Sequence, residues 1–231
     1  MSENSEKSAG WPIFKVLASP GKAFEEIAAN PAFLKTALVI CGLSLLLGIA
    51  VSPKIQEFTL LMINKNPTSI PPEQAAIAAK AAMAASIVFA AVIPWLVWLM
   101  VAVLFKVYAM FAGGNATFKT YFSVAVYGYL PQFIGGLIGT VLLLAAPVEN
   151  FQNVSLSLAA LLPAQSGFLY FFLSQCSPFT WWSLVLYGIG GAAATKTRPS
   201  GAITYIVVLW LLYALAAAAL ASIKAPAGMV G

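Results

Sequence analysis

Long stretches without a charged side chain are the feature that most restricts how this chain can fold. Several windows exceed the roughly 18 apolar residues that a bilayer-crossing helix needs. Only 8% of the 231 residues are charged, whereas soluble domains carry about 25%. Hydrophobic residues make up 61% of the chain, more than a water-soluble protein of this size can cover with polar surface. The sequence therefore predicts an integral, all-α membrane protein that contacts the lipid bilayer.

Five apolar segments predict five transmembrane helices, and we place them at 34–51, 81–112, 121–146, 178–194 and 202–223. Ser52-Pro53-Lys54 is expected to end the first span. Pro94 should kink the second span and Pro131 interrupts the third. Residues 54–80 are predicted as a polar loop, in which a stretch of good helix formers begins at Pro72 and runs into span 2.

The segment 147–177 is apolar, but Pro147, Pro163 and Gly167 punctuate it. Neither of its two apolar pieces clearly spans a bilayer. We predict an interfacial or re-entrant segment before span 4, with a sixth span as the alternative.

The flanking segments give the rest of the organisation: a disordered tail at 1–10, a cytoplasmic juxtamembrane amphipathic segment at 11–33, a membrane domain at 34–224 and a short tail at 225–231. Within 11–33, Ser19 and Pro20 are a good helix start. Phe24 and Ile27 lie three residues apart on one face. We expect this juxtamembrane helix to lie on the membrane surface, and a solvated linker is the alternative.

The distribution of basic residues predicts the orientation. Five spans place the termini on opposite sides, and a cytoplasmic N-terminus puts eight basic residues inside and four outside, in accord with the positive-inside rule. The inner set is Lys7, Lys15, Lys22, Lys35, Lys106, Lys119, Lys196 and Arg198, and the outer set is Lys54, Lys65, Lys80 and Lys224. We therefore predict an N-terminus in the cytoplasm and a C-terminus outside.

The absent residue types exclude several chemistries. The chain has no histidine, and all seven acidic residues are glutamates. A Ser-His-Asp triad, an aspartate dyad and a histidine metal site therefore cannot be built. No Lys/Arg run with interleaved aromatics supports nucleic-acid binding. We expect no enzyme activity, no metal and no cofactor.

Two groups of residues are candidates for a role within the spans. Small residues on one helix face let helix backbones approach closely, and the predicted packing positions are Gly135, Gly139, Gly188 and Ala192. The kink at Pro131 frees a backbone carbonyl, and polar groups around it could line a cavity with Lys106. That predicted cavity set is Tyr127, Tyr129, Gln132 and Lys106. The alternatives are interhelical hydrogen bonding by the three polar side chains and snorkelling by Lys106 to the inner headgroups.

Four motifs, in order, resemble the Yip family of membrane proteins (Ypt/Rab-interacting proteins). They lie within about residues 14–222 and read Ser19-Pro20-Gly21-Lys22-Ala23-Phe24-Glu25-Glu26-Ile27 followed by Asn30-Pro31; Gly113-Gly114-Asn115-Ala116-Thr117-Phe118-Lys119; Tyr127-Gly128-Tyr129-Leu130-Pro131; and Ser177-Pro178-Phe179-Thr180-Trp181-Trp182-Ser183-Leu184-Val185-Leu186-Tyr187-Gly188-Ile189-Gly190.

The resemblance implies five spans and a cytosolic N-terminus. It also implies links to vesicle traffic between endoplasmic reticulum and Golgi, binding of Rab-type GTPases and association between members, as in eukaryotic relatives. Those relatives carry a long cytoplasmic N-terminal region, whereas this chain has about 33 residues there. The compact, alanine-rich form resembles the prokaryotic members and favours a prokaryotic inner (cytoplasmic) membrane.

Two functions follow as expectations. The first is a non-enzymatic scaffold or adaptor in membrane organisation or trafficking, which self-associates through the small-residue faces and meets a cytoplasmic protein partner at its juxtamembrane helix. The alternative is a channel or passive transporter for a small ion or solute, with the polar set around Pro131 lining its path.

Overall fold

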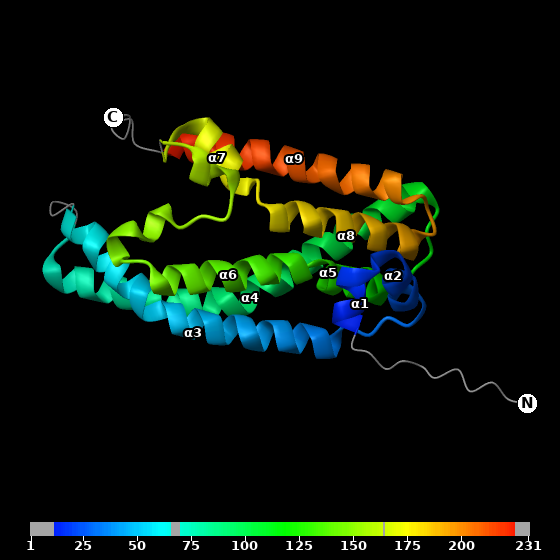
Figure 1. Cartoon of the computed structure of the whole chain (residues 1–231), viewed down its shortest axis with the longest axis horizontal. Helices are drawn as coiled ribbons and strands as arrows, with labels where there is room; N and C mark the ends of the chain where they lie inside the picture. The colour runs from blue at the N-terminus through cyan, green and yellow to red at the C-terminus, as the bar shows by residue number, and fades with distance from the viewer. Residues whose placement is uncertain (1–11, 66–69, 164, 225–231) are drawn as a thin grey trace, which may run out of the picture.

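The structure, a computed structural model, describes residues 12–65, 70–163 and 165–224, and these are helical throughout apart from turns and short loops (Figure 1). The predicted tails at 1–10 and 225–231 lie outside the described residues. The helices are α1 (Pro12–Ala18), α2 (Pro20–Ala29), α3 (Leu34–Lys65), α4 (Pro72–Ala112), α5 (Phe118–Gly128), α6 (Leu130–Ala145), α7 (Gly167–Gln175), α8 (Pro178–Thr195) and α9 (Pro199–Lys224).

Four helical segments among the described residues are long and apolar enough to cross a membrane: Leu34–Lys65, Pro72–Ala112, Phe118–Ala145 and Pro199–Ile223. They confirm that four of the five predicted spans form such helices. The segment predicted at 178–194 forms α8, which is helical as expected but is not among the four. α8 contacts α2, α5, α6 and α9, so much of its surface meets protein rather than the surroundings.

The bundle has two ends, which we name by what they carry. The α2 end holds α1, α2, the turn from α4 to α5 and the turn from α8 to α9 (Figure 1). The hairpin end holds the C-terminal end of α3 and the N-terminal end of α4 (Figure 1). α3 and α4 are 32 and 41 residues long, about 48 and 60 Å at 1.5 Å per residue, and they extend beyond the hairpin end of α6 (Figure 1).

The predicted end of span 1 at Ser52-Pro53-Lys54 is wrong, because α3 continues through Pro53 to Lys65. Proline lacks the N–H that would reach the carbonyl four residues earlier. Here the hydroxyl of Ser52 donates to that carbonyl, Ile49 O, over 2.9 Å. The predicted loop at 54–80 is consequently mostly helix, and the helix expected to begin at Pro72 is confirmed as the start of α4.

The segment 147–177 contains no helix of spanning length in its described residues. It forms two 3₁₀ helices, Val148–Asn153 and Leu158–Leu161, followed by the nine-residue α7. Phe151 stacks on Phe58 of α3 with ring centroids 5.1 Å apart, and α7 packs against α9 (Figure 1). The sixth span left open by the composition is therefore not formed.

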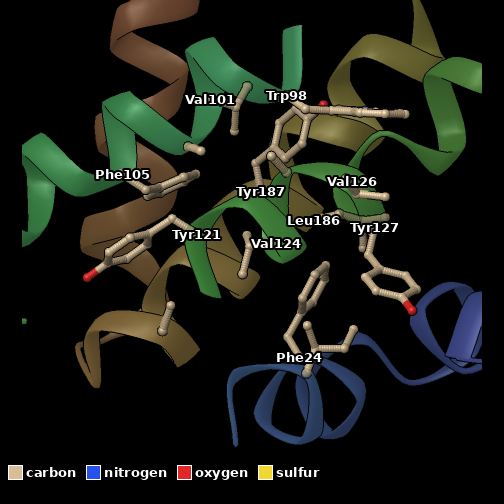
Figure 2. Close-up of a cluster of buried hydrophobic side chains, with 14 of the residues drawn as sticks. Phe24, Trp98, Val101, Phe105, Tyr121, Val124, Val126, Tyr127, Leu186 and Tyr187 are labelled. Carbon is tan, nitrogen blue, oxygen red and sulfur yellow. The ribbon is translucent and has the colours of Figure 1, made fainter. Parts of the chain in front are cut away.

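The buried core lies toward the α2 end. Its largest fully buried side chains include Trp98 and Phe105 of α4, Tyr121 of α5 and Phe24 of α2. Figure 2 shows these side chains within one cluster that four different elements supply, with Leu186 and Tyr187 of α8 among them. Burial of such aromatic side chains stabilises this end of the bundle.

At the hairpin end, Lys54 of α3 holds the end of α6. Its ammonium group donates to the backbone carbonyls of Leu143 and Leu144, at 3.2 and 2.7 Å, and to that of Ala146. The last carbonyls of a helix have no partner within the helix and carry partial negative charge. Lys54 therefore caps α6 from a neighbouring helix.

Candidate functional site

Two places in the bundle gather polar groups beside empty space. The first, which we call the end pocket, lies at the α2 end and has a volume of about 890 Å³. The second is inside the bundle around Tyr129, Gln132, Thr180 and Ser183, which we call the polar cluster. Each is built from segments that lie far apart in the sequence.

The end pocket is formed where four helices end or begin. Gly113 ends α4 with a left-handed backbone (φ 78°), a conformation that glycine adopts without strain. Thr117 begins α5, where its hydroxyl accepts from the N–H of Thr120 over 3.3 Å. Lys196 ends α8, also with a left-handed backbone (φ 56°). Together with Glu25 of α2, these residues line the pocket.

The juxtamembrane helix forms one wall of the end pocket, and its packing corrects the expectation of a helix lying on the membrane surface. Phe24 is fully buried and Ile27 is 5% exposed, because this apolar face packs on α5 and α8. Figure 2 shows the Phe24 ring pointing from α2 into the bundle. A Cβ placed on Gly190 of α8 would lie 2.8 Å from that ring, so glycine at this position makes room for Phe24.

The start of α2 is partly as predicted. Ser19 occupies the N-cap position and Pro20 the first turn, but the Ser19 side chain makes no capping hydrogen bond. An ion pair between Lys15 of α1 and Glu26 of α2 joins the two short helices instead.

The polar cluster joins α6 to α8. The backbone N–H of Gln132 donates to the Ser183 hydroxyl over 3.3 Å, and the Gln132 side-chain amide donates to the Thr180 hydroxyl over 3.2 Å. Pro131 supplies the first turn of α6, where helix N–H groups have no partner in the helix. The serine hydroxyl thus satisfies one of these N–H groups from a neighbouring helix.

Two cavities lie on either side of the polar cluster, and Tyr129 and Gln132 line both. The α3 cavity, between α3, α4 and α6, has a volume of about 350 Å³. The α9 cavity, between α4, α6, α8 and α9, has a volume of about 390 Å³.

The structure brings together only part of the predicted cavity set. Tyr129 and Gln132 share the polar cluster, whereas Tyr127 lies nearer the α2 end. Its hydroxyl donates to Ala32 O over 3.0 Å and accepts from Thr36 over 3.1 Å. Lys106 is exposed and lines neither cavity.

Thr180 and Ser183 complete the polar cluster but were not singled out from the sequence. Their spacing of three residues places both on one face of α8. That spacing is the signal that a search for polar pairs within the spans would have used.

The predicted packing positions are used inside the chain. A Cβ on Gly135 would lie 2.7 Å from the Phe179 ring of α8, and one on Gly188 would lie 2.6 Å from Ile203 Cα of α9. Ala192 is 2% exposed. A Cβ on Gly139 would make ordinary contact with Leu156 at 3.7 Å. The faces of Gly135, Gly188 and Ala192 are therefore covered by neighbouring helices and are not free for a second molecule.

The long apolar helices and the partly buried polar cluster between them define a polytopic helical membrane protein. The sequence profile of the Yip1 domain matches residues 14–221, so the chain belongs to the Yip1 family and the resemblance seen in its motifs is confirmed. "Membrane protein YknW" of Bacillus subtilis (strain 168) is 26% identical over 226 residues, covering 92% of this chain and 93% of that protein. No solved structure matches the chain significantly.

Proposed function

We propose that this Yip1-family protein is a non-enzymatic scaffold that crosses a bacterial cytoplasmic membrane five times and receives a cytoplasmic protein at its end pocket. The observation that carries the proposal is the construction of the α2 end. There the short helices α1 and α2 are packed into the core, and the turns between longer helices frame a pocket of about 890 Å³.

The fifth crossing in this proposal is α8. Its 18 residues make a helix of about 27 Å, close to the roughly 30 Å of a hydrocarbon core. It contains three glycines, and two of them, Gly188 and Gly190, have α9 or α2 packed directly upon them. A helix that contacts protein on several sides needs less apolar surface than one that faces lipid. This accounts for the absence of α8 from the four helices that are apolar enough to cross a membrane by composition alone.

The charges support placing the α2 end in the cytoplasm. This end carries seven basic residues and two acidic ones among the described residues, whereas the hairpin end has basic and acidic residues in similar number. Cytoplasmic loops of membrane proteins carry such an excess. The basic residues at the α2 end are Lys15, Lys22, Lys35, Lys106, Lys119, Lys196 and Arg198, against Glu25 and Glu26.

The surroundings of the pocket indicate the chemistry of the partner. Lys22, Lys119, Lys196 and Arg198 are all exposed at this end, so its outer surface is basic. An acidic protein surface would be attracted to it over about 8–10 Å at physiological salt. By family analogy alone, the corresponding partner of the eukaryotic members is a Rab-type GTPase.

Site-specific photocrosslinking in cells tests the proposal. A benzoylphenylalanine at Asn115, an exposed position that lines the pocket, is expected to crosslink to a cytoplasmic protein that mass spectrometry identifies. The matched control is the same probe at Lys80, exposed near the hairpin end. Equal crosslinking of that protein from both positions, or crosslinking to none from Asn115, contradicts the proposal.

A second candidate is passive passage of a small solute, favoured by the two cavities that meet at Tyr129 and Gln132. In liposomes holding the purified protein, Gln132→Leu is expected to remove any flux above empty liposomes. This substitution replaces the side-chain amide that donates to Thr180 with an apolar group at the point where the two cavities meet. Lys106→Met is the control, because Lys106 lines neither cavity. Absence of flux from the folded wild-type protein counts against this candidate, as does flux that Gln132→Leu leaves unchanged.

A further inference from the structure

The α9 cavity lies deep within the proposed membrane region. Its α4 wall runs from Val97 to Leu104, which is 8 to 15 residues before the end of α4 at Ala112. At 1.5 Å per residue that is about 12–22 Å from the α2 end, which falls within a hydrocarbon core of about 30 Å.

The cavity has a mouth between α4 and α9. These helices meet toward the α2 end, where the Tyr205 hydroxyl donates to Leu104 O over 2.9 Å and the rings of Tyr108 and Tyr205 lie 4.9 Å apart. Beyond this contact, Met100 of α4 and Tyr213 of α9 line the cavity and are 55% and 59% exposed. A mouth between two spanning helices opens toward lipid rather than water.

The cavity lining contains one buried polar group without a hydrogen-bond partner, the Tyr187 hydroxyl, and several partly exposed polar groups. Tyr187 is only 5% exposed, and its buried hydroxyl has no hydrogen-bond partner. Tyr129, Tyr213 and Gln175 also line the cavity, and within the described parts of the chain their side chains make no hydrogen bond. Buried polar groups are almost always paired, so the Tyr187 hydroxyl indicates a missing partner, and the three partly exposed groups are free to bind the same partner.

The partner is neutral and carries both hydrogen-bond donors and acceptors. No charged residue is among those that line the cavity, and an unpaired ion at this depth is strongly disfavoured. Tyrosine hydroxyls and glutamine amides can donate to carbonyl oxygens, and the glutamine oxygen can accept from a hydroxyl. Several apolar residues, among them Leu209 and Trp210, complete the lining, as in sites that take an amphiphile.

We propose that the α9 cavity binds the head of a neutral glycerolipid with a free hydroxyl, such as diacylglycerol, which enters between α4 and α9. The two ester carbonyls and the hydroxyl match the donors and acceptors of the lining. The acyl chains stay in the bilayer outside the mouth. This lipid site is separate from the end pocket and goes beyond the scaffold function.

The test uses the full-length protein in phosphatidylcholine nanodiscs with a photoactivatable, clickable diacylglycerol. Labelling is expected to saturate, to be displaced by unlabelled dioleoylglycerol and to map to α4 and α9 peptides around Met100 and Leu209. A phosphatidylglycerol probe with the same photoreactive chain is expected to label these peptides at least fivefold less. Equal, non-saturating labelling by both probes would identify ordinary boundary lipid and overturn the proposal.

Two adjacent positions on α9 provide a matched pair of variants. Leu209→Trp fills the cavity and is expected to reduce specific labelling at least fivefold. Val208→Trp adds the same bulk at a residue that is 48% exposed and does not line the cavity, so labelling should stay at the wild-type level. Unchanged labelling in Leu209→Trp would overturn the proposal.

A conservative variant separates binding from folding. Tyr187→Phe removes only a hydroxyl that has no protein partner, so the fold is expected to be retained in size-exclusion chromatography. Specific labelling should fall about fivefold, the size of one hydrogen bond. Tyr170→Phe on α7, outside the cavity, should leave it unchanged. Full labelling of a folded Tyr187→Phe protein would also overturn the proposal.

Discussion

Replacing Phe24 with alanine is expected to lower the free energy of unfolding by about 3–5 kcal/mol, the cost of removing a large aromatic side chain from a packed interior. Phe24 is fully buried, and its ring lies against the space left by Gly190 of α8. Loss of the ring leaves a cavity at the centre of the α2 end. Thermal unfolding of the purified protein in detergent, followed by near-UV circular dichroism, measures the change.

Phe14→Ala provides the matched control in the same juxtamembrane segment. Phe14 is 73% exposed, so its removal should change stability by less than about 0.5 kcal/mol. If α2 instead lies on the membrane surface, both variants would leave the bundle equally stable in detergent. Equal melting temperatures for the two proteins would therefore refute the packing of α2 into the core.

Replacing Gly188 with alanine is expected to destabilise the protein by about 3 kcal/mol, the upper end for overpacking. The added Cβ would lie 2.6 Å from Ile203 Cα, and a backbone atom cannot rotate away as a side chain can. α8 and α9 would have to separate, although these helices share one of the larger contacts in the bundle. The melting temperature and the folded fraction in size-exclusion chromatography report the effect.

Gly136→Ala on α6 makes the same chemical change in open space, because nothing lies within 4 Å of a Cβ there. Alanine favours a helix over glycine by about 0.5–1 kcal/mol, so this control should be neutral or stabilising. A Gly188→Ala protein as stable as the Gly136→Ala protein would disprove the close approach of α8 and α9.

The positions of the long helices could be predicted because lipid-facing surface requires a long apolar sequence. The continuation of α3 through Pro53 could not be predicted, because it depends on a single hydroxyl. The Ser52 hydroxyl donates to Ile49 O in place of the N–H that Pro53 lacks. The Ser-Pro pair at Ser177-Pro178 starts α8, whereas the Ser-Pro pair at Ser52-Pro53 lies within α3. Local sequence alone does not distinguish the two situations.

The packing of α2 was also beyond the sequence. An amphipathic face such as that of Phe24 and Ile27 fits a bilayer surface and a protein groove equally well. The choice depends on Gly190, about 160 residues away, which leaves room for the ring. For the same reason, Tyr129 and Gln132 could be predicted as polar groups near a kink, but Thr180 and Ser183 became their neighbours only through the packing of α6 on α8.

The unequal helix lengths determine how the protein responds to bilayer thickness. α4 has apolar length to spare, because no charged residue lies between Lys80 and Lys106, so it can adapt to a thicker membrane. α8, at about 27 Å, has none in the five-crossing arrangement, and its start is joined directly to α7. Hydrophobic mismatch costs a fraction of a kcal/mol per Å, and in this protein it would fall on the junction of α7 and α8. Gln175 and Thr180, which flank that junction, line the α9 cavity, so membrane thickness would alter the cavity more than it alters the end pocket.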